Sequence, residues 1–193
     1  SFQAVSQLPC KPFDAARDGI NLGEGAGTVI LTSNKKYSYG VKIGGGSVSN
    51  DANHISGPSR TGEELSLAIN KTLQASGIFA KDIGFISAHG TATIFNDEME
   101  AKAIGLSGLQ EVPVNSLKGY YGHTLGAAGL IESIISIQSL KENLVLPTRG
   151  FHTSGVSQPV NICSSVYKST GAHFLKTASG FGGCNAAMVF SKQ

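Results

Sequence analysis

The chain has 193 residues, a length that suits one ordinary domain, and 40% of them are hydrophobic, enough to bury a sizeable core. Charged residues make up only 15% and the formal net charge is +2 without a basic run, so no nucleic-acid partner is expected. Three widely spaced cysteines argue against a disulfide framework and a cysteine-based zinc site, and favour a reducing, cytoplasmic location.

No segment of the sequence predicts a membrane span or a targeting signal. The most apolar stretch, residues 125–140, is interrupted by Glu132 and several serines, which makes it too polar for a bilayer. The chain opens on Ser1 rather than methionine and no leader pattern follows, so we expect that processing or truncation removed residues upstream. No linker or change in composition divides the chain, which predicts a single domain over residues 1–193.

The first part of the chain predicts two strands and a helix. Residues 20–32 become rich in β-branched and apolar side chains and predict a strand, and residues 41–49 predict another. Thr61 and Glu64 have the spacing of a capping box that would start a helix. The apolar residues that follow recur on one helical face, and Gly77 would end the helix.

The middle of the chain alternates short strands with helices. Residues 83–86 predict a buried strand, and Asn96 or Asp97 could cap a second helix that runs through Ile104. Residues 112–114 predict another short strand. This alternation implies crossover connections and a largely parallel sheet, and therefore an α/β domain.

The last part of the chain predicts one helix and a hairpin. Residues 125–141 are apolar almost all round, so this helix is expected to be central and buried. Residues 173–178 and 186–190 predict two strands, and the glycine-rich connection between them suits an antiparallel hairpin on the same sheet.

Two histidines follow segments of this predicted sheet, and glycines flank both. His89 lies in the sequence Ala-His-Gly-Thr and His123 in Gly-His-Thr-Leu-Gly. Ligands of open α/β sheets bind outside the carboxyl ends of strands, so either histidine could serve in acid–base catalysis or stabilise an oxyanion. The alternative is that each histidine only caps the turn or helix that follows.

Lys118 and Glu132 are a candidate ion pair. Glu132 lies within the most apolar predicted helix, and a buried carboxylate there needs a partner. A positive Lys118 near His123 would also disfavour the imidazolium and keep that ring a neutral N–H donor. The alternative is that Lys118 is a solvated surface residue.

Other motifs in the sequence carry weaker signals. Residues 180–183, Gly-Phe-Gly-Gly, could present backbone N–H groups to an oxyanion, although a tight turn is the simpler interpretation. Cys184 beside this loop could be a nucleophile, but no histidine neighbours it in sequence and we expect a small buried side chain. His89, His123 and Asp97 lack the spacing of a metal site, so no metal is predicted.

Taken together, these segments resemble the C-terminal half of β-ketoacyl-ACP synthases, the condensing enzymes of the thiolase-like fold. The blocks that match in order are residues 12–27, residues 88–91 with Asn96, Asp97 and Glu100, Lys118 with residues 122–129 and Glu132, Pro147 with Thr148, and residues 180–183 with Asn185. The resemblance implies one thiolase-like α/β half, a five-stranded mixed sheet with helices on both faces.

The resemblance also implies a decarboxylative Claisen condensation of malonyl-ACP with an acyl thioester, in fatty acid or polyketide-type synthesis. In that reaction His89 and His123 would be two neutral donors to the enolate oxygen, where losing one donor typically slows the reaction about a hundredfold or more. Lys118, paired with Glu132, would set the electrostatics around His123. No cofactor is implied.

The remaining implied roles concern the substrate and the partners. Thr91 and Thr93 match threonines that hydrogen-bond the pantetheine arm, and Phe181 with Gly182 matches the loop of the oxyanion hole and gate. The implied partners are an acyl carrier protein with phosphopantetheine-linked acyl or malonyl groups, the N-terminal half, and a second subunit in a full-length dimer.

Three departures from the family pattern limit what the resemblance implies. The nucleophilic cysteine block is absent from these 193 residues, since Cys10 is too close to the first matching block. Ser179 replaces a gating phenylalanine, and residues 119–121 differ from the commoner sequence after the lysine. We therefore expect the chain alone to be inactive, with an exposed apolar patch where the other half would pack. The acyl primer and chain length stay open.

Two alternatives remain at this point. A thiolase shares the fold, and Cys184 lies near the loop that carries its basic cysteine, although residues 88–91 and Lys118 favour the decarboxylating branch. The other alternative is a nucleophile-free subunit that sets chain length beside an active synthase, against which the presence of both histidines argues.

Overall fold

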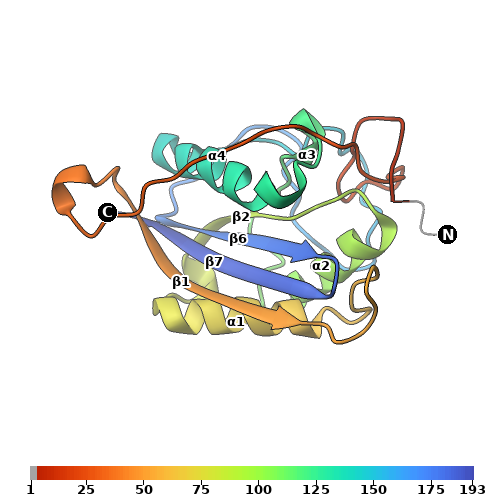
Figure 1. The fold of residues 1–193 in the computed structure, drawn as a ribbon, viewed down its shortest axis with the longest axis horizontal. Coiled ribbons are helices and arrows are strands. Elements are labelled where there is room, and N and C mark those ends of the chain that lie inside the picture. Colours follow the sequence, from red (N-terminus) through yellow and green to blue (C-terminus); the bar gives the residue numbers. More distant parts are fainter. Residues whose placement is uncertain (1–3) are drawn as a thin grey trace.

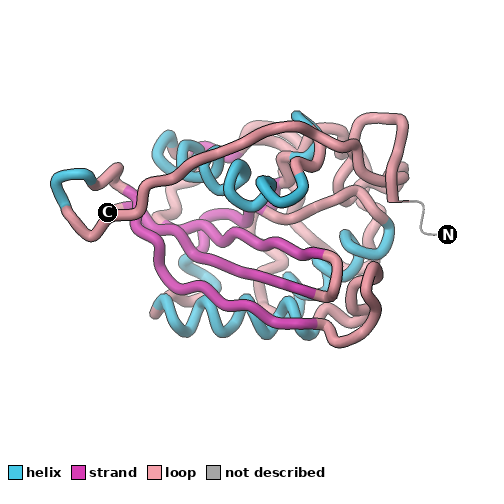
Figure 2. The backbone as a smooth tube through the Cα atoms, viewed as in Figure 1, coloured by secondary structure: helices cyan, strands magenta, loops and turns pink. Residues whose placement is uncertain are grey.

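A five-stranded sheet with strand order β1-β7-β6-β2-β3 lies between helices in the computed structural model, which describes residues 4–193 (Figure 1). Helices α1 and α2 contribute to the core on one face of this sheet, and α4 packs against the other. Before β1 the described chain contains only loops and the short turn η1 (Figure 2). The elements are η1 (Lys35–Tyr37), β1 (Val41–Asn50), α1 (Glu63–Ser76), η2 (Ala80–Asp82), β2 (Ile83–Ser87), α2 (Ile94–Leu106), β3 (Val114–Asn115), α3 (Lys118–Tyr121), η3 (Leu125–Ala127), α4 (Ala128–Glu142), β4 (Leu144–Val145), β5 (Tyr167–Lys168), β6 (His173–Gly180) and β7 (Cys184–Lys192).

The directions of the strands bring distant segments to one edge of the sheet. β2 runs parallel to β3 and β6, whereas β7 is antiparallel to both β6 and β1. The predicted hairpin and the mixed sheet with helices on both faces are confirmed, and the sheet is less parallel than the strand–helix alternation indicated. Because β2 and β6 are parallel, the loops that follow them leave the same edge of the sheet.

Neither α1 nor α2 begins at the cap that the sequence predicts. Gly62, with φ 78°, precedes α1, so the prediction that Thr61 caps this helix is wrong. A Cβ at Gly62 would lie 2.6 Å from the carbonyl oxygen of Met99, so the close approach of α2 requires glycine. α2 begins after Thr93, and Asn96 and Asp97 lie inside its first turns. Gly77 ends α1, as predicted.

The strand predicted over residues 20–32 is absent. Residues 23–32 form a loop that runs across the outer side of α4 (Figure 1), and no strand of residues 4–193 pairs with it. Glycine permits this contact, since a Cβ at Gly27 would lie 3.2 Å from Cδ1 of Ile134. Apolar side chains cannot by themselves make a strand, because its backbone groups need a partner strand.

α4 is less buried than its composition suggests. The prediction of a central buried helix is wrong: Leu130 and Ile134 are 39% and 37% exposed, whereas Glu132, Ser133 and Ser136 are buried. Its small polar residues therefore face the sheet together with Leu140, whereas Leu130 and Ile134 face outward. No helix within residues 4–193 is long and apolar enough to cross a membrane.

The outward orientation of α4 leaves apolar side chains exposed beside the loop of residues 23–32. Ile30 and Leu31 on that loop are 88% and 71% exposed. We call these exposed apolar side chains of the loop, η3 and α4 the outer apolar surface; its members are Val29, Ile30, Leu31, Leu125, Leu130 and Ile134. A group of this kind is typical of a surface that another polypeptide covers.

Because Ser136 is buried and Ile134 is partly exposed, a substitution at Ser136 is expected to destabilise the fold more than one at Ile134. Ile134→Ser alters a partly exposed side chain and is expected to lower the free energy of unfolding by less than about 1 kcal/mol. Ser136→Ile adds volume to a side chain that is 1% exposed, and overpacking is expected to lower the same quantity by about 2 to 3 kcal/mol. Urea unfolding of the two variants measures this difference. A larger loss for Ile134→Ser would contradict the orientation.

Candidate active site

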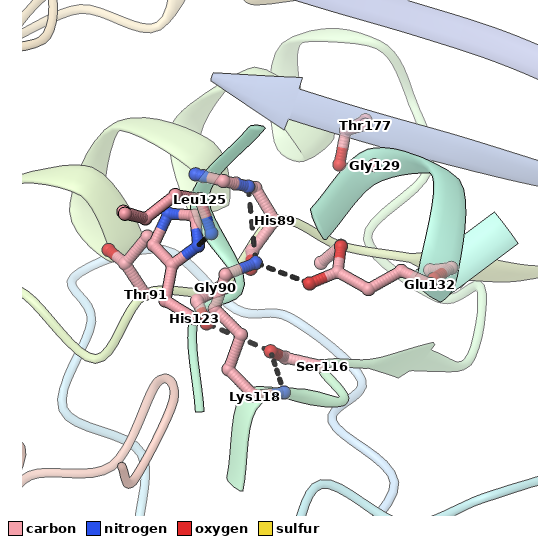
Figure 3. Close-up of polar contacts among 12 residues, drawn as sticks. His89, Gly90, Thr91, Ser116, Lys118, His123, Leu125, Gly129, Glu132 and Thr177 are labelled. Carbon is pink, nitrogen blue, oxygen red and sulfur yellow. Dashed lines mark hydrogen bonds and ion pairs between the residues drawn. The ribbon is translucent and has the colours of Figure 1, made fainter. Parts of the chain in front are cut away.

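The two sequence-predicted histidines lie together at one edge of the sheet. His89 follows β2 and His123 follows α3. Their ring centroids are 5.2 Å apart and the rings are nearly perpendicular, at 81° (Figure 3). His89 is buried and His123 is partly exposed, so the pair forms the floor of a site that solvent reaches from the His123 side.

Glu100 of α2 holds the loop that carries His89. Its two carboxylate oxygens each accept a backbone N–H, one from His89 and one from Gly90, both at 2.8 Å. The Thr177 hydroxyl donates to the same carboxylate at 2.5 Å. Gly90 has φ 45°, and a Cβ there would lie 2.5 Å from Cβ of Ser116, so the loop passes where only glycine fits. The backbone of His89 is thus fixed from α2 and β6.

The backbone of His123 is held by a segment from the start of the chain. Its N–H donates to the carbonyl of Asn21 at 2.7 Å, and its carbonyl accepts from the N–H of Gly23 at 2.9 Å. Gly122, with φ 79°, permits this approach, because a Cβ there would lie 2.9 Å from the Gly23 nitrogen. Residues 21–23, which lie within the block 12–27 on which the resemblance rests, therefore position the backbone of His123.

Lys118 lies beneath the histidine pair and is fully enclosed. Its Nζ lies 2.6 Å from Oε1 of Glu132, and both side chains are at most 1% exposed. The sequence-predicted ion pair is present, and the alternative of a solvated lysine is wrong. The same ammonium donates to the carbonyl of His89 at 2.5 Å and lies 3.2 Å from Nδ1 of His89 (Figure 3). Its three protons thus have three acceptors.

These contacts decide which ring nitrogen carries the proton. An ammonium has no acceptor site, so Nδ1 of His89 must accept from Lys118 and the ring proton lies on Nε2. Nδ1 of His123 accepts the backbone N–H of Leu125 at 3.1 Å, which leaves Nε2 of that ring protonated as well. Both neutral imidazoles therefore have an Nε2–H group that these contacts do not use.

Burial, reinforced by the neighbouring ammonium groups, keeps both imidazoles neutral. Burial lowers the pKa of His89 well below its usual value, and the ammonium groups of Lys118 and Lys176 lower it further. Burial, followed by Lys118, lowers the pKa of His123 to about 4. Burial alone would raise the pKa of Glu132, but Lys176 and Lys118 outweigh it and the net direction is downward. Glu132 is therefore the anion of the cluster.

Lys176 is the residue that sequence reasoning missed. It lies on β6 and its Nζ is 2.6 Å from Oε2 of Glu132, so two lysines bind one carboxylate. Its side chain is 5% exposed. A signal was present in the strand: Phe174 belongs to the buried core, and two-residue alternation places Lys176 on the same face. A lysine in the inward phase of a buried strand needs an anionic partner.

The two candidate pantetheine-binding threonines lie beside His89. The hydroxyls of Thr91 and Thr93 are 2.8 Å apart. Asp97 accepts the N–H groups of Thr91 at 2.9 Å and Phe13 at 2.7 Å, and burial raises its pKa to about 6. Asp97 therefore holds this loop through two backbone N–H groups.

Residues 4–193 contain no group of three or more side chains that could hold a metal ion.

The loop predicted to form the oxyanion hole is the turn between β6 and β7. It leaves the same edge of the sheet as His89, and Gly182 donates its N–H to the carbonyl of Ile55 at 2.6 Å. The Phe181 side chain is 79% exposed. Cys184, next to this turn, is exposed, so the expectation of a small buried side chain is wrong there.

The sequence of the chain matches a known protein family. The sequence profile described as "Beta-ketoacyl synthase, C-terminal domain" matches residues 39–152, more than half of the chain. The chain belongs to this family. The 3-oxoacyl-[acyl-carrier-protein] synthase 2 of Vibrio cholerae is 34% identical over 96% of this chain and 48% of its own length.

Solved structures agree with this β-ketoacyl synthase assignment. A β-ketoacyl synthase from Burkholderia phymatum superposes with a TM-score of 0.93 at 28% identity, over 100% of this chain and 50% of that one. A type II polyketide ketosynthase in complex with its acyl-carrier protein gives 0.90 at 28% identity, over 96% and 48%. The resemblance stated from sequence is confirmed, and the chain spans about half the length of the relatives it matches.

The site predicts that both histidines stay neutral in mildly acidic solution. The pKa of His123 is lower in the folded chain than in the unfolded one, so its neutral form stabilises the fold above about pH 6.5 and this contribution is lost as pH falls through about 4. At about pH 6 we expect imidazole ¹⁵N spectra to show neutral Nε2–H tautomers for His89 and His123, with a histidine peptide as the reference. Imidazolium signals at that pH would contradict the assignment.

Proposed function

We propose that this domain is the enolate-stabilising half of a condensing enzyme, which joins a malonyl unit on an acyl carrier protein to an acyl thioester. The observation that carries the proposal is the convergence of His89 and His123, two neutral rings 5.2 Å apart whose Nδ1 atoms are both occupied. Their Nε2–H groups can donate together to a single oxygen, which is the requirement of an enolate.

The proposed chemistry has two steps in which these donors take part. The carbon–carbon bond to the malonyl carboxylate breaks, CO₂ leaves, and the electron pair forms an enolate whose charge lies on the thioester oxygen. The enolate carbon then attacks the acyl thioester, a new carbon–carbon bond forms and the enzyme thiolate leaves. An imidazolium would be acidic enough to protonate the enolate, so neutral donors preserve the nucleophile until it reacts.

The nucleophile in this proposal belongs to an N-terminal half beyond the 193 residues. Cys10 and Cys163 are buried, and burial raises the pKa of both thiols, that of Cys163 to about 11. Such thiols are poor nucleophiles.

The outer apolar surface provides an area against which the N-terminal half would pack, and full-length subunits would form dimers. Three unpaired cysteines agree with work in a reducing cytoplasm.

Decarboxylation of malonyl-ACP by the protein joined to its N-terminal half tests the role of the histidines. Release of labelled CO₂ is expected to fall about a hundredfold or more in His89→Asn and in His123→Asn, because each variant removes one donor to the enolate. His152→Asn, which alters an exposed histidine, is the control and should keep the parent rate. Parent rates in both site variants, or exchange of acetyl-CoA without any malonyl substrate, would point to a thiolase-type enzyme instead.

The 193-residue chain alone tests where the nucleophile resides. Incubation with a radiolabelled acyl-ACP is expected to leave no label on the protein after denaturation, because Cys10 and Cys163 are buried and the proposed nucleophile lies in the other half. The chain mixed with its N-terminal half should become labelled. A stable acyl-enzyme formed by the chain alone would contradict the proposal that the nucleophile lies in the N-terminal half. Labelling of Cys184→Ser would then show whether the exposed Cys184 thiol carries the acyl group.

A further inference from the structure

The ammonium group of Lys176 lies in a shell made only of oxygen atoms. Besides Oε2 of Glu132 at 2.6 Å, it reaches the carbonyls of Thr177 at 2.8 Å, Ser87 at 3.1 Å and Ala88 at 3.3 Å. Two of these carbonyls belong to the end of β2 and the segment that leads into His89. The ammonium therefore binds the backbone directly before His89, whereas Glu100 binds the N–H groups of His89 and Gly90.

A second buried ammonium is not needed to neutralise Glu132. Lys118 alone balances that carboxylate, and Lys176 leaves the three-residue cluster with one net positive charge. Burying an extra cation is unfavourable by several kcal/mol before its contacts are counted. The ammonium of Lys176 must therefore have another role. Either it only joins β2 to β6, or its charge acts on a molecule bound at the two histidines.

The surroundings favour an electrostatic role. Besides its own members, the cluster is faced by Glu100 from α2, Tyr121 from α3, Cys10 and the two histidines. Burial raises the pKa of Tyr121 and of Cys10, so both are neutral groups. Glu100 is bound by two backbone N–H groups and a hydroxyl, so its charge is already stabilised by donors of its own. No described carboxylate forms an ion pair with Lys176 besides Glu132.

We propose that Lys176 is a positioning residue whose ammonium keeps the Lys118–Glu132–Lys176 cluster net positive behind the two imidazoles, so that a substrate anion balances this charge. The proposal rests on the proposed function for the identity of the anion, the enolate and the malonyl carboxylate before it. Lys176 does not touch the substrate in this scheme. It acts through Glu132 and through the backbone that leads into His89.

The test separates charge from hydrogen bonding at this position. Lys176→Gln keeps N–H donors for the carbonyls but loses the charge, whereas Lys176→Met loses both. Lys168→Met, on the exposed strand β5, is the matched control. In ¹⁵N titrations of the 193-residue chain, both Lys176 variants should protonate His89 and His123 at higher pH than the parent and the control, because a neighbouring positive charge has been removed.

A merely structural role gives a different result. It predicts that Lys176→Gln leaves the histidine titrations at their parent positions, and that outcome would overturn the proposal. In the protein joined to its N-terminal half, both neutral variants should lower kcat for decarboxylation about tenfold with little change in KM. If the parent protein is itself inactive, the proposed function fails, while the titrations still decide whether Lys176 acts by its charge.

Free ammonium keeps the proposal testable if the neutral variants do not fold. Lys176→Ala would leave a space lined by the same oxygen atoms, into which ammonium chloride is expected to bring back both the folded chain and the low histidine pKa values. Tetramethylammonium chloride at equal concentration is the control, since that ion cannot donate hydrogen bonds. Equal recovery of the fold and of the titrations in the two salts would overturn the proposal.

Discussion

The burial of the Glu132 carboxylate between two ammonium groups is the interaction on which the rest of the site depends. Lys118 and Lys176 each approach one of its oxygens to 2.6 Å, so three elements, α3, α4 and β6, are joined at one point. A buried carboxylate with one partner removed would be strongly destabilising. Because Lys118 also binds Nδ1 and the carbonyl of His89, the position of this carboxylate determines which nitrogen of that ring carries the proton.

The same carboxylate explains why Leu130 and Ile134 of α4 face outward while its small polar residues face the sheet. Glu132 must face the sheet to reach its lysines, and helical periodicity then places Ser136 and Ser139 on the inner side with it. Leu130 and Ile134 are consequently turned outward, where the loop of residues 23–32 covers them only in part. A polar requirement at one residue thus contributes to the outer apolar surface, against which the proposed N-terminal half would pack.

Sequence reasoning succeeded where the signal is local. The hairpin of β6 and β7 and the helix that ends at Gly77 follow from short-range patterns, and the Lys118–Glu132 pair follows from the cost of a buried carboxylate. It failed where a distant segment decides: the strand predicted over residues 20–32 has no partner strand, and Gly62 replaces a side-chain cap because α2 passes close by. Lys176 reaches Glu132 only through the packing of β6 against α4, which no spacing in the sequence expresses.

The site separates positive charge from acidity. An enolate is stabilised by positive potential but destroyed by an acidic proton within reach, and a single cationic donor would supply both. Here the protons of Lys118 are taken by Glu132 and by two atoms of His89, and those of Lys176 by three backbone carbonyls, while its charge lies against Glu132. In the proposed reaction, the groups left to face the reacting oxygen are the Nε2–H donors of uncharged rings, which hold their protons far more tightly than an imidazolium does. The positive charge of the buried lysines and the weakly acidic Nε2–H donors can then stabilise one anion together without protonating it.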